Sequence, residues 1–319
     1  MTEMPKVESI SIGPLVNSPE VTVLIPTYNR KTILLKALKG LFLQTFPHDK
    51  LEIVVIDDGS TDGTLDAIQA LTPPVQIVCT KTQRMGPAGA RNQGLKIARG
   101  EIVIFMDSDI VPCPEFVEAH VKIHTKDNLI GHGPVIHTND LENPTEAEMK
   151  ITDIANAFFA TGNASIFKKH LFAAGLFDED FREYGWEDLE LGLRLRRQGL
   201  EKAKVPEAKG FHYKPKLTVR DLPKWKQRER ERGHTAVIYY RKHPIYKVRL
   251  QTMISPFWLG LDRLLSLGGW TEKQSVEEYL IKLEERGNHL WLRFIVRLIT
   301  SHSYFEGIRE TLREAESRV

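Results

Sequence analysis

Cysteine is scarce in this chain of 319 residues, which has only Cys79 and Cys113. Two cysteines cannot form a disulfide framework and cannot by themselves hold a structural zinc ion. We expect both to be inert thiols in a reducing compartment. The sequence also lacks a run of about 18 apolar residues, so we expect no transmembrane helix. Its first residues show no basic segment followed by an apolar stretch, so we expect no secretory signal. We therefore expect a cytoplasmic protein, either free or peripheral at the inner face of the membrane.

Two phosphate-binding motifs are missing as well. There is no G-x-x-x-x-G-K-[ST], and no G-x-G-x-x-G follows the first predicted strand. A P-loop ATPase and a classical dinucleotide-binding fold are therefore disfavoured. The sequence contains no repeat of fixed period.

Charge is nearly balanced overall but uneven along the chain. The net charge is +2, whereas residues 201–250 contain 15 Lys and Arg against 5 Asp and Glu. Part of this basic block alternates in sign and is typical of a solvated helix. The alternative is that the block attracts an anionic membrane or a lipid-linked acceptor. We expect no nucleic-acid partner, and the sequence leaves the oligomeric state open.

The first 140 residues alternate β-branched runs with amphipathic segments. Strands are predicted at 21–25, 51–56, 75–80 and 102–106, with helices between them. The run IVIFM at 102–106 is apolar throughout, which is typical of a central strand buried on both faces. This order predicts an α/β fold with a mostly parallel central sheet covered by helices. Beyond Asp221 the pattern is helical, and we interpret the apolar stripe of Trp258, Leu261, Leu264 and Leu265 as packing rather than membrane contact.

Polar residues follow three of these strands, where ligands bind in open parallel sheets. The tripeptide Asp107-Ser108-Asp109 can hold Mg²⁺ or Mn²⁺ through carboxylate oxygens. Asp57 and Asp58 are either turn and cap residues or acceptors for a ribose or a base. The cluster after the first strand is Pro26, Thr27, Tyr28, Asn29 and Arg30, in which Tyr28 offers a ring for base stacking. Arg91, near the start of a Gly-flanked helix, can meet an anionic diphosphate.

These motifs resemble a known family. IPTYNR, VIDDGSTDGT and ARNQGLKIARGEIVIFMDSD are similar to the nucleotide-binding half of family 2 glycosyltransferases of the GT-A fold. The segment TGNASIFKKHLFAAGLFDEDFREYGWEDLELGLRLRRQG resembles the acceptor half of inverting galactosyltransferases and chondroitin polymerases. The resemblance covers about residues 20–215. It implies the following division: an N-terminal extension (1–19), a nucleotide-sugar-binding half (20–137), an acceptor-binding and catalytic half (138–220) and a C-terminal helical region (221–319).

The resemblance also implies roles for individual residues. Asp188 would be the general base, and Glu187 would hydrogen-bond the acceptor beside Gly185 and Trp186, whose ring would stack on a sugar. Asp109, Asp107 and His212 would hold Mn²⁺ or Mg²⁺. The residues expected to contact the UDP-sugar are Pro26, Thr27, Tyr28, Arg30, Asp57, Asp58, Arg91, Asp107 and Ser108.

The expected activity is a metal-dependent, inverting transfer of a sugar from a UDP-sugar to a hydroxyl of a carbohydrate or lipid-linked carbohydrate acceptor. The expected product class is surface polysaccharide, oligosaccharide or glycolipid. Three alternatives stay open at this point. A nucleotidyltransferase would place similar acidic pairs around a metal, a catalytically silent protein would bind a sugar or a membrane surface on the same scaffold, and a retaining enzyme would preserve the anomeric configuration.

Overall fold

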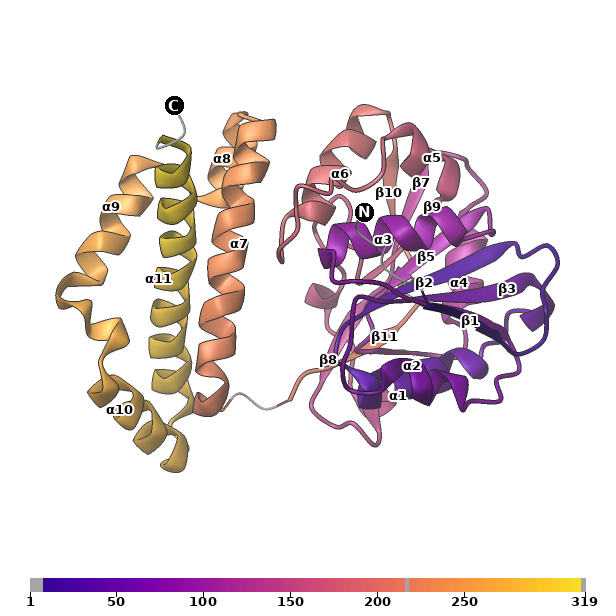
Figure 1. Ribbon diagram of the computed structural model, residues 1–319, viewed down its shortest axis with the longest axis horizontal. Coiled ribbons are helices and arrows are strands. Elements are labelled where there is room, and N and C mark those ends of the chain that lie inside the picture. Colours follow the sequence, from indigo (N-terminus) through magenta and orange to yellow (C-terminus); the bar gives the residue numbers. More distant parts are fainter. Residues whose placement is uncertain (1–7, 216–217, 317–319) are drawn as a thin grey trace, which may run out of the picture. The chain divides into compact units, whose positions relative to one another are not determined.

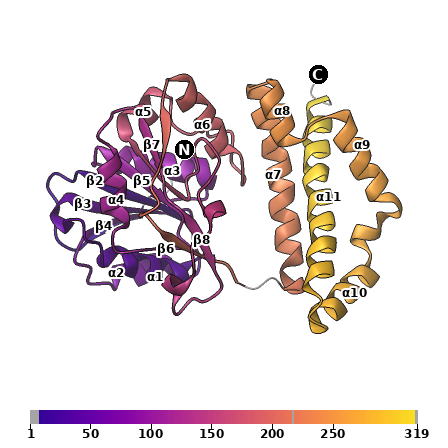
Figure 2. The same ribbon diagram turned by 180° about the vertical axis from the view of Figure 1, so that it is seen from behind.

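The computed structural model describes residues 8–215 and 218–316. The chain divides into two compact units, which are described separately. The first contains residues 1–182 and 188–215, and the second contains 183–187 and 216–319. All strands belong to the first unit, whereas the second is built from helices (Figures 1 and 2).

A large mixed sheet forms the centre of the first unit. Its order is β1 (Glu8–Ile12), β4 (Gln76–Lys81), β3 (Leu51–Asp57), β2 (Val21–Thr27), β5 (Ile102–Met106), β9 (Asn163–Phe167), β7 (Leu129–His132) and β10 (Glu201–Lys204). Strands β4, β3, β2 and β5 run parallel, as the sequence predicted, but β9 is antiparallel to both of its neighbours. The apolar run of β5 lies between β2 and β9 and is buried along its whole length. The sequence analysis did not find β1 and β7, which are short and carry polar residues.

Helices cover both faces of this sheet (Figure 1). On one face, α3 packs closely, because a Cβ added at Gly94 would lie 2.1 Å from Leu24 Cδ1. The opposite face is covered by α1, α2 and α4, which share one apolar core with alternating residues of the strands. The helices of the unit are α1 (Lys31–Phe42), α2 (Thr64–Gln69), α3 (Gly86–Ile97), α4 (Phe116–Ile123), α5 (Lys168–Ala173) and α6 (Glu187–Arg197). The first residue of α6 is counted with the second unit. Short 3₁₀ turns are η1 (His48–Lys50), η2 (Pro144–Glu146) and η3 (Ile151–Asp153).

A second, three-stranded sheet lies near the end of β5. It consists of β6 (Ile110–Pro112), β11 (Gly210–Tyr213) and β8 (Val135–Thr138), with β11 in the middle. The antiparallel pairing sets His212 opposite Ile110, and the parallel pairing sets His212 opposite His137. This sheet therefore brings a histidine from late in the chain to the DSD tripeptide.

The second unit is a helical assembly, which confirms the predicted C-terminal helical region. Its long helices α7 and α11 pack closely at two glycines: a Cβ added at Gly233 would lie 2.1 Å from Tyr304 O, and one at Gly307 would lie 2.1 Å from Arg230 O. A separate core contains Leu222, Leu280 and Ile299. The elements are η4 (Val219–Asp221), α7 (Leu222–Lys242), α8 (Tyr246–Thr252), α9 (Pro256–Leu265), η5 (Leu267–Glu272), α10 (Gln274–Glu285) and α11 (His289–Glu316).

Among the described residues, no helix is both long and apolar enough to cross a bilayer. Both cysteines are free and buried, in agreement with the prediction that they are inert. Burial raises the pKa of the Cys79 thiol to about 12, so this thiol stays protonated at neutral pH.

Three histidines of the first unit are neutral groups: His120 and His132 are buried, and His124 is half-buried. His120 Nδ1 and His124 Nε2 lie 2.9 and 2.8 Å from the hydroxyl oxygen of Ser165, and His120 Nε2 lies 2.7 Å from Asn163 Oδ1. Burial lowers the pKa of His120 to about 3, and the pKa values of His124 and His132 to about 4. These contacts join helix α4 to strand β9 of the sheet.

We predict that this cluster makes the first unit unstable in mild acid. The unfolded chain protonates these histidines near pH 6.5, whereas the folded chain does not until about pH 4, so stability is lost as pH falls through this window. The free energy of unfolding should fall by about 2 kcal/mol per histidine between pH 7 and pH 5. Urea unfolding at both pH values measures it. The His124→Gln variant should show a smaller drop than the wild type, and an equal drop in both proteins would contradict the explanation.

Candidate active site

The polar clusters predicted from the sequence meet at one edge of the large sheet. Thr27 and Asp57 are paired in register at the ends of β2 and β3. Asp107 follows β5 directly, and β5 pairs with β2. Because these strands are parallel, their carboxyl ends and the loops that follow lie together at this edge.

Two buried polar atoms at this edge have no hydrogen-bond partner within the described part of the chain. Asp57 Oδ1 accepts a hydrogen bond from Ser60 N at 2.8 Å, but Asp57 Oδ2 has none. The hydroxyl of Thr27 is also without a partner. A buried polar atom without a partner is destabilising, typically by about 1–3 kcal/mol. A ligand that donates to Asp57 Oδ2 would remove that cost, and the N–H of a nucleotide base is such a donor.

Asp58 instead holds the start of helix α3. Its carboxylate accepts hydrogen bonds from Met85 N at 2.7 Å and Gly86 N at 3.1 Å. Burial raises the pKa of Asp58, against the lowering effect of these two hydrogen bonds. Gly86 is required at this point, because its φ is +81° and an added Cβ would lie 2.0 Å from Arg182 O. Asp58 thus acts here as the cap that the sequence allowed, and its nucleotide contact stays a prediction.

The two loops after β2 and β3 are fastened to each other. Asn29 has a left-handed backbone, with φ of 50°, and its side chain accepts a hydrogen bond from Thr61 N at 2.8 Å. Asn29 N donates to Ser60 Oγ at 2.8 Å, and Lys31 N donates to Asp62 Oδ2 at 2.9 Å. The side chains of Asn29 and Ser60 thus bond across to the neighbouring loop, and neither caps the helix that follows it.

Tyr28 and Arg84 form a cationic, aromatic surface beside these loops. The Arg84 guanidinium lies 3.8 Å from the centre of the Tyr28 ring, which is 39% exposed. Such stacking is favourable and leaves a positive charge near the site. The sequence analysis did not find Arg84; its position shortly after β4, at the same sheet edge, was the available signal.

Arg91 is buried beside the first acid of the DSD tripeptide. It lies in the second turn of α3, one turn later than expected, and its Nη2 is 3.6 Å from Asp107 Oδ1. Its guanidinium also lies 5.6 Å from the centre of the Phe177 ring. The Arg91 side chain is 7% exposed and that of Asp107 is 40% exposed. Asp107 is therefore the more accessible partner, held next to a fixed positive charge.

Asp109 is largely enclosed, with its side chain 14% exposed. Its Oδ2 forms an ion pair with Arg30 and lies 3.1 Å from His212 Nε2. Although burial alone raises the pKa of Asp109, the hydrogen bond from His212 and the charge of Arg30 lower it below its usual value. Asp109 Oδ1 is buried and has no hydrogen-bond partner among the described residues. The carboxylate therefore keeps one oxygen for another ligand.

The donor set fits a divalent cation. Asp109 Oδ1 and His212 are an oxygen and a nitrogen ligand of the kinds that Mn²⁺ accepts. Within residues 8–215 and 218–316, no three His, Cys, Asp or Glu side chains converge closely enough to hold a metal alone. Mg²⁺ and Mn²⁺ sites commonly use one or two carboxylates and complete their shell with water and substrate phosphate. The cation would share the Asp109 carboxylate with Arg30, so Arg30 and the cation compete for its charge.

The predicted acceptor residues lie on a strained loop. Gly185 has a φ of 107° and Trp186 a φ of 70°, which is unusual for a bulky residue. Residues 183–187 belong to the second unit, whereas Asp188 is counted with the first. Glu187 is buried at the first position of α6, and Asp188 Oδ1 accepts a hydrogen bond from Leu189 N at 2.7 Å. Backbone strain of this kind occurs most often at functional sites.

Trp186 is bound by helix α7. Its indole N–H donates to Arg232 O at 2.9 Å, and its ring stacks on Tyr239 with centres 5.9 Å apart. The Arg232 guanidinium lies 5.1 Å from the centre of the same ring, and Trp186 is only 6% exposed. Most of the Trp186 ring is therefore buried against α7. Its contact with a sugar stays a prediction.

Further contacts fix the rest of this loop. His234 bridges Glu183 and Glu310, with N–O distances of 2.7 and 3.0 Å. Burial acts to lower the pKa of His234, but its hydrogen bonds to Glu310 and Glu183 raise it overall. The hydroxyl of Thr235 donates to Tyr184 O at 3.1 Å. Helices α7 and α11 thus hold the segment that leads directly into Asp188.

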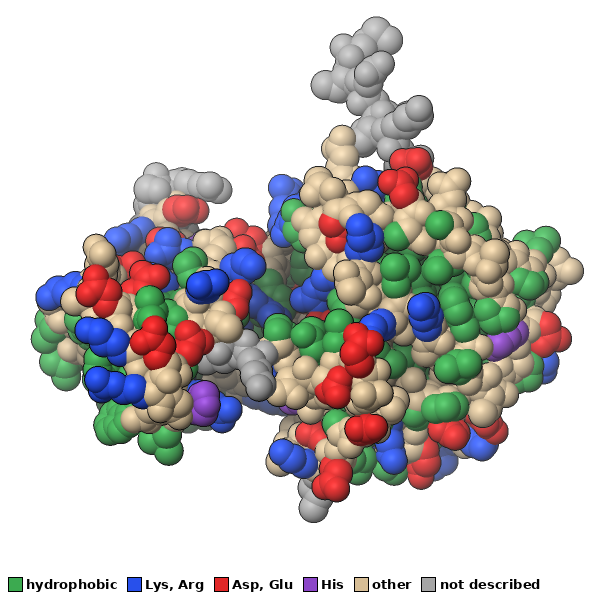
Figure 3. All heavy atoms as spheres, turned by 90° about the horizontal axis from the view of Figure 1, so that it is seen from below, with side chains coloured by type: hydrophobic (Ala, Val, Ile, Leu, Met, Phe, Trp, Pro, Cys, Tyr) green, Lys and Arg blue, Asp and Glu red, His purple; other side chains and the backbone are tan. Residues whose placement is uncertain are grey.

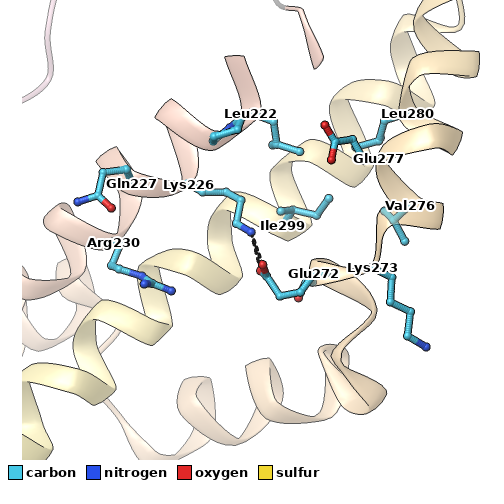
Figure 4. Close-up of a pocket in the computed structure, with 12 residues that line it drawn as sticks. Leu222, Lys226, Gln227, Arg230, Glu272, Lys273, Val276, Glu277, Leu280 and Ile299 are labelled. Atoms are coloured by element: carbon cyan, nitrogen blue, oxygen red, sulfur yellow. Dashed lines mark hydrogen bonds and ion pairs between the residues drawn. The ribbon is translucent and has the colours of Figure 1, made fainter. Parts of the chain in front are cut away.

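A pocket of about 350 Å³ lies in the second unit between α7, α10, η5 and α11 (Figure 4). Leu222, Val276 and Leu280 line one part of it, and Lys226 pairs with Glu272 at 2.6 Å across another. Arg230, also at the pocket, pairs with Glu306 at 2.7 Å. Both of these cations at the pocket are therefore already paired with carboxylates.

Comparison with known proteins identifies the domain that contains these clusters. The family model for glycosyl transferase family 2 matches residues 22–177, which include every strand-end cluster described above except His212. This chain carries a family 2 glycosyltransferase domain. The domain covers the predicted nucleotide-sugar-binding half and extends through β9 and α5.

Relatives and solved structures agree with this family. The chain is 30% identical over 241 residues to the uncharacterized glycosyltransferase YfnE of Bacillus subtilis (57% of this chain, 61% of the relative). It is 29% identical over 239 residues to chondroitin synthase of Escherichia coli (61% of this chain, 35% of the relative). The chain thus spans only part of the length of these relatives.

Two solved structures show the same fold. A mannosyltransferase from Pyrobaculum calidifontis, solved with GDP-Man and Mn²⁺, has a TM-score of 0.58 at 21% identity, covering 94% of this chain and 89% of that one. Residues 1–349 of TarS from S. aureus, solved with UDP, has a TM-score of 0.51 at 19% identity, covering 93% and 92%. These likenesses confirm the GT-A glycosyltransferase fold.

We predict that His234 fixes the loop before Asp188. Removing both of its charge-assisted bonds in His234→Ala should increase amide hydrogen exchange of a peptide covering 183–187 by about tenfold. Lys226→Ala, which breaks an ion pair on the same helix with no loop contact, is the matched control and should leave this peptide unchanged. Equal exchange in His234→Ala and the wild type would show that the other loop contacts suffice.

Proposed function

We propose that this chain is a metal-dependent inverting glycosyltransferase that uses a UDP-sugar. The observation that carries the proposal is the buried Asp109 carboxylate, which has a histidine on one oxygen and no partner on the other. Two solved structures with the same fold support a nucleotide donor and a metal, because one contains GDP-Man with Mn²⁺ and the other contains UDP. Asp57 Oδ2 and Tyr28 provide an acceptor and a ring for a base at the same edge.

On the donor side, each residue has a distinct task. Thr27, Asp57 and Tyr28 would hold the uridine, with Pro26 and Asp58 shaping the surrounding loops. Arg91 and Arg30 would attract the diphosphate, and Asp107, beside Ser108, would contact the ribose or the metal. Asp109, Asp107 and His212 would hold Mn²⁺ or Mg²⁺, which when bound offsets the negative charge developing on the leaving diphosphate.

On the acceptor side, Asp188 acts as the general base. It takes the proton from the acceptor hydroxyl as that oxygen forms a bond to the anomeric carbon. The bond between this carbon and the UDP oxygen breaks, and UDP leaves with the electron pair. Attack opposite to UDP inverts the configuration. Glu187 would accept a hydrogen bond from the acceptor, with Gly185 and Trp186 shaping the same loop.

The acceptor is proposed to be a carbohydrate or a lipid-linked carbohydrate, and the product a polysaccharide, oligosaccharide or glycolipid. The chondroitin synthase relative supports a carbohydrate acceptor. The buried, unpaired cysteines suit a reducing compartment, and we therefore place the reaction in the cytoplasm.

Donor hydrolysis tests the proposed chemistry without a known acceptor, because water can replace the acceptor hydroxyl. With Mn²⁺ and a panel of UDP-sugars, the wild type should release UDP rather than pyrophosphate. Proton NMR should show that the free sugar first appears with inverted configuration. Release of pyrophosphate would identify a nucleotidyltransferase, retained configuration would overturn the inverting mechanism, and no turnover of any donor would favour a silent binding protein.

Asp188→Asn should lower the rate of this hydrolysis by about 10²–10⁴-fold, because the general base is lost. Its affinity for UDP should be unchanged, since Asp188 contacts the acceptor and not the nucleotide. Asp66→Asn, on the exposed face of α2, is a control expected to match the wild type. A normal rate in Asp188→Asn would exclude this residue as the base.

A further inference from the structure

Helix α9 of the second unit turns its apolar residues outward. Within Pro256–Leu265, all of which the structure describes, Asp262 alone is buried. Phe257 is 67% exposed, Leu264 62% and Leu265 53%. A helix in water normally buries its apolar side and exposes its charges, so this burial pattern is reversed.

The reversed orientation is fixed by a polar anchor. Asp262 is 6% exposed and lies 3.1 Å from His302 Nδ1 of α11. Arg309 of α11 donates to Asp262 Oδ2 at 2.7 Å. Two charge-assisted bonds to a buried carboxylate are strong and directional. Helix α9 therefore cannot turn its apolar side onto α11 without breaking the bonds from Asp262 to His302 and Arg309.

The earlier interpretation of this stripe was thus wrong in part. Trp258 and Leu261 are half-buried, but Leu264 and Leu265 are not packed inside the unit. Helix α8 extends the exposed apolar character of this segment, because Tyr246 is 75% exposed and Leu250 is 54% exposed. Exposed hydrophobic side chains are visible at the outer edge of the second unit in Figure 3.

Every exposed charge on α8 and α9 is positive. Lys247, Arg249 and Arg263 are exposed, and the only acidic residue in the sequence from 243 to 271 is the buried Asp262. By contrast, two basic residues of α7, Lys226 and Arg230, are paired with Glu272 and Glu306 inside the unit. Helices α8 and α9 thus offer exposed positive charge beside their exposed apolar residues.

We propose that the exposed apolar residues of α8 and α9, namely Tyr246, Leu250, Phe257, Leu264 and Leu265, bind the surface of an anionic lipid bilayer. The apolar side chains enter the boundary between headgroups and acyl chains, while Lys247, Arg249 and Arg263 remain at the lipid phosphates. A second copy of the chain is a poorer partner for these helices, because a two-fold dimer through them would bring the same three cations of both copies together.

Sedimentation with vesicles tests this proposal. The full chain should bind vesicles of phosphatidylcholine with 30% phosphatidylglycerol more tightly than vesicles of phosphatidylcholine alone. Added salt should weaken the binding. The triple variant Phe257→Ser, Leu264→Ser, Leu265→Ser should lower the partition coefficient at least about tenfold, because apolar insertion is lost. Lys247→Glu with Arg249→Glu should remove the preference for anionic lipid.

A matched control has equally exposed apolar residues in the first unit. The triple variant Leu15→Ser, Leu43→Ser, Phe172→Ser should bind vesicles like the wild type. All variants should keep the wild-type melting temperature and UDP affinity, which separates this test from the proposed transfer reaction. Three results would overturn the proposal. The first is no vesicle binding by the wild type, and the second is full vesicle binding by the Phe257 triple variant. The third is a wild type that binds no vesicles but is a dimer in sedimentation velocity, while the triple variant is a monomer.

Discussion

The site is organised by a buried carboxylate whose hydrogen bonding is incomplete. Asp109 is enclosed by Arg30 and His212 on one oxygen, while its other oxygen has no partner among the described residues. Such an arrangement costs free energy in the protein alone and is offset when a cation binds. The pairing of β11 with β6 and β8 positions His212 beside Asp109. The paired ends of β2 and β3 position Asp57 at the edge of the large sheet.

Rigid loops around this edge complete the arrangement. Asp58 fastens the start of α3, and Asn29, Ser60 and Asp62 fasten the loops after β2 and β3 to each other. A site held in this way loses little conformational freedom when a ligand binds, which favours affinity and orientation. The second unit does the same for the loop before Asp188, through Trp186 and His234. This gives the C-terminal helices a role that their sequence did not reveal.

The sequence predicted those parts of the structure that depend on local pattern. The strand at 102–106 was found with its observed limits, because five consecutive apolar residues indicate burial on both faces. The strand-end clusters were also found from the sequence, because the carboxyl ends of parallel strands lie together at one edge of the sheet. The antiparallel direction of β9, the backbone partners of Asp58 and the exposed apolar residues of α9 were not predictable from the sequence. Each depends on a contact between residues distant in sequence, such as Asp262 with Arg309, and no local pattern encodes it.

The most direct test of the account is a calorimetric titration of UDP into the protein with Mn²⁺ and then with EDTA. The account predicts that UDP binds with Mn²⁺, that EDTA abolishes or greatly weakens binding, and that Asp109→Asn reproduces the effect of EDTA while Asp66→Asn binds like the wild type. Binding of equal strength in EDTA, or an Asp109→Asn variant that still responds to Mn²⁺ like the wild type, would contradict the assignment of the metal to Asp109. Absence of UDP binding under every condition would contradict the proposed donor site itself.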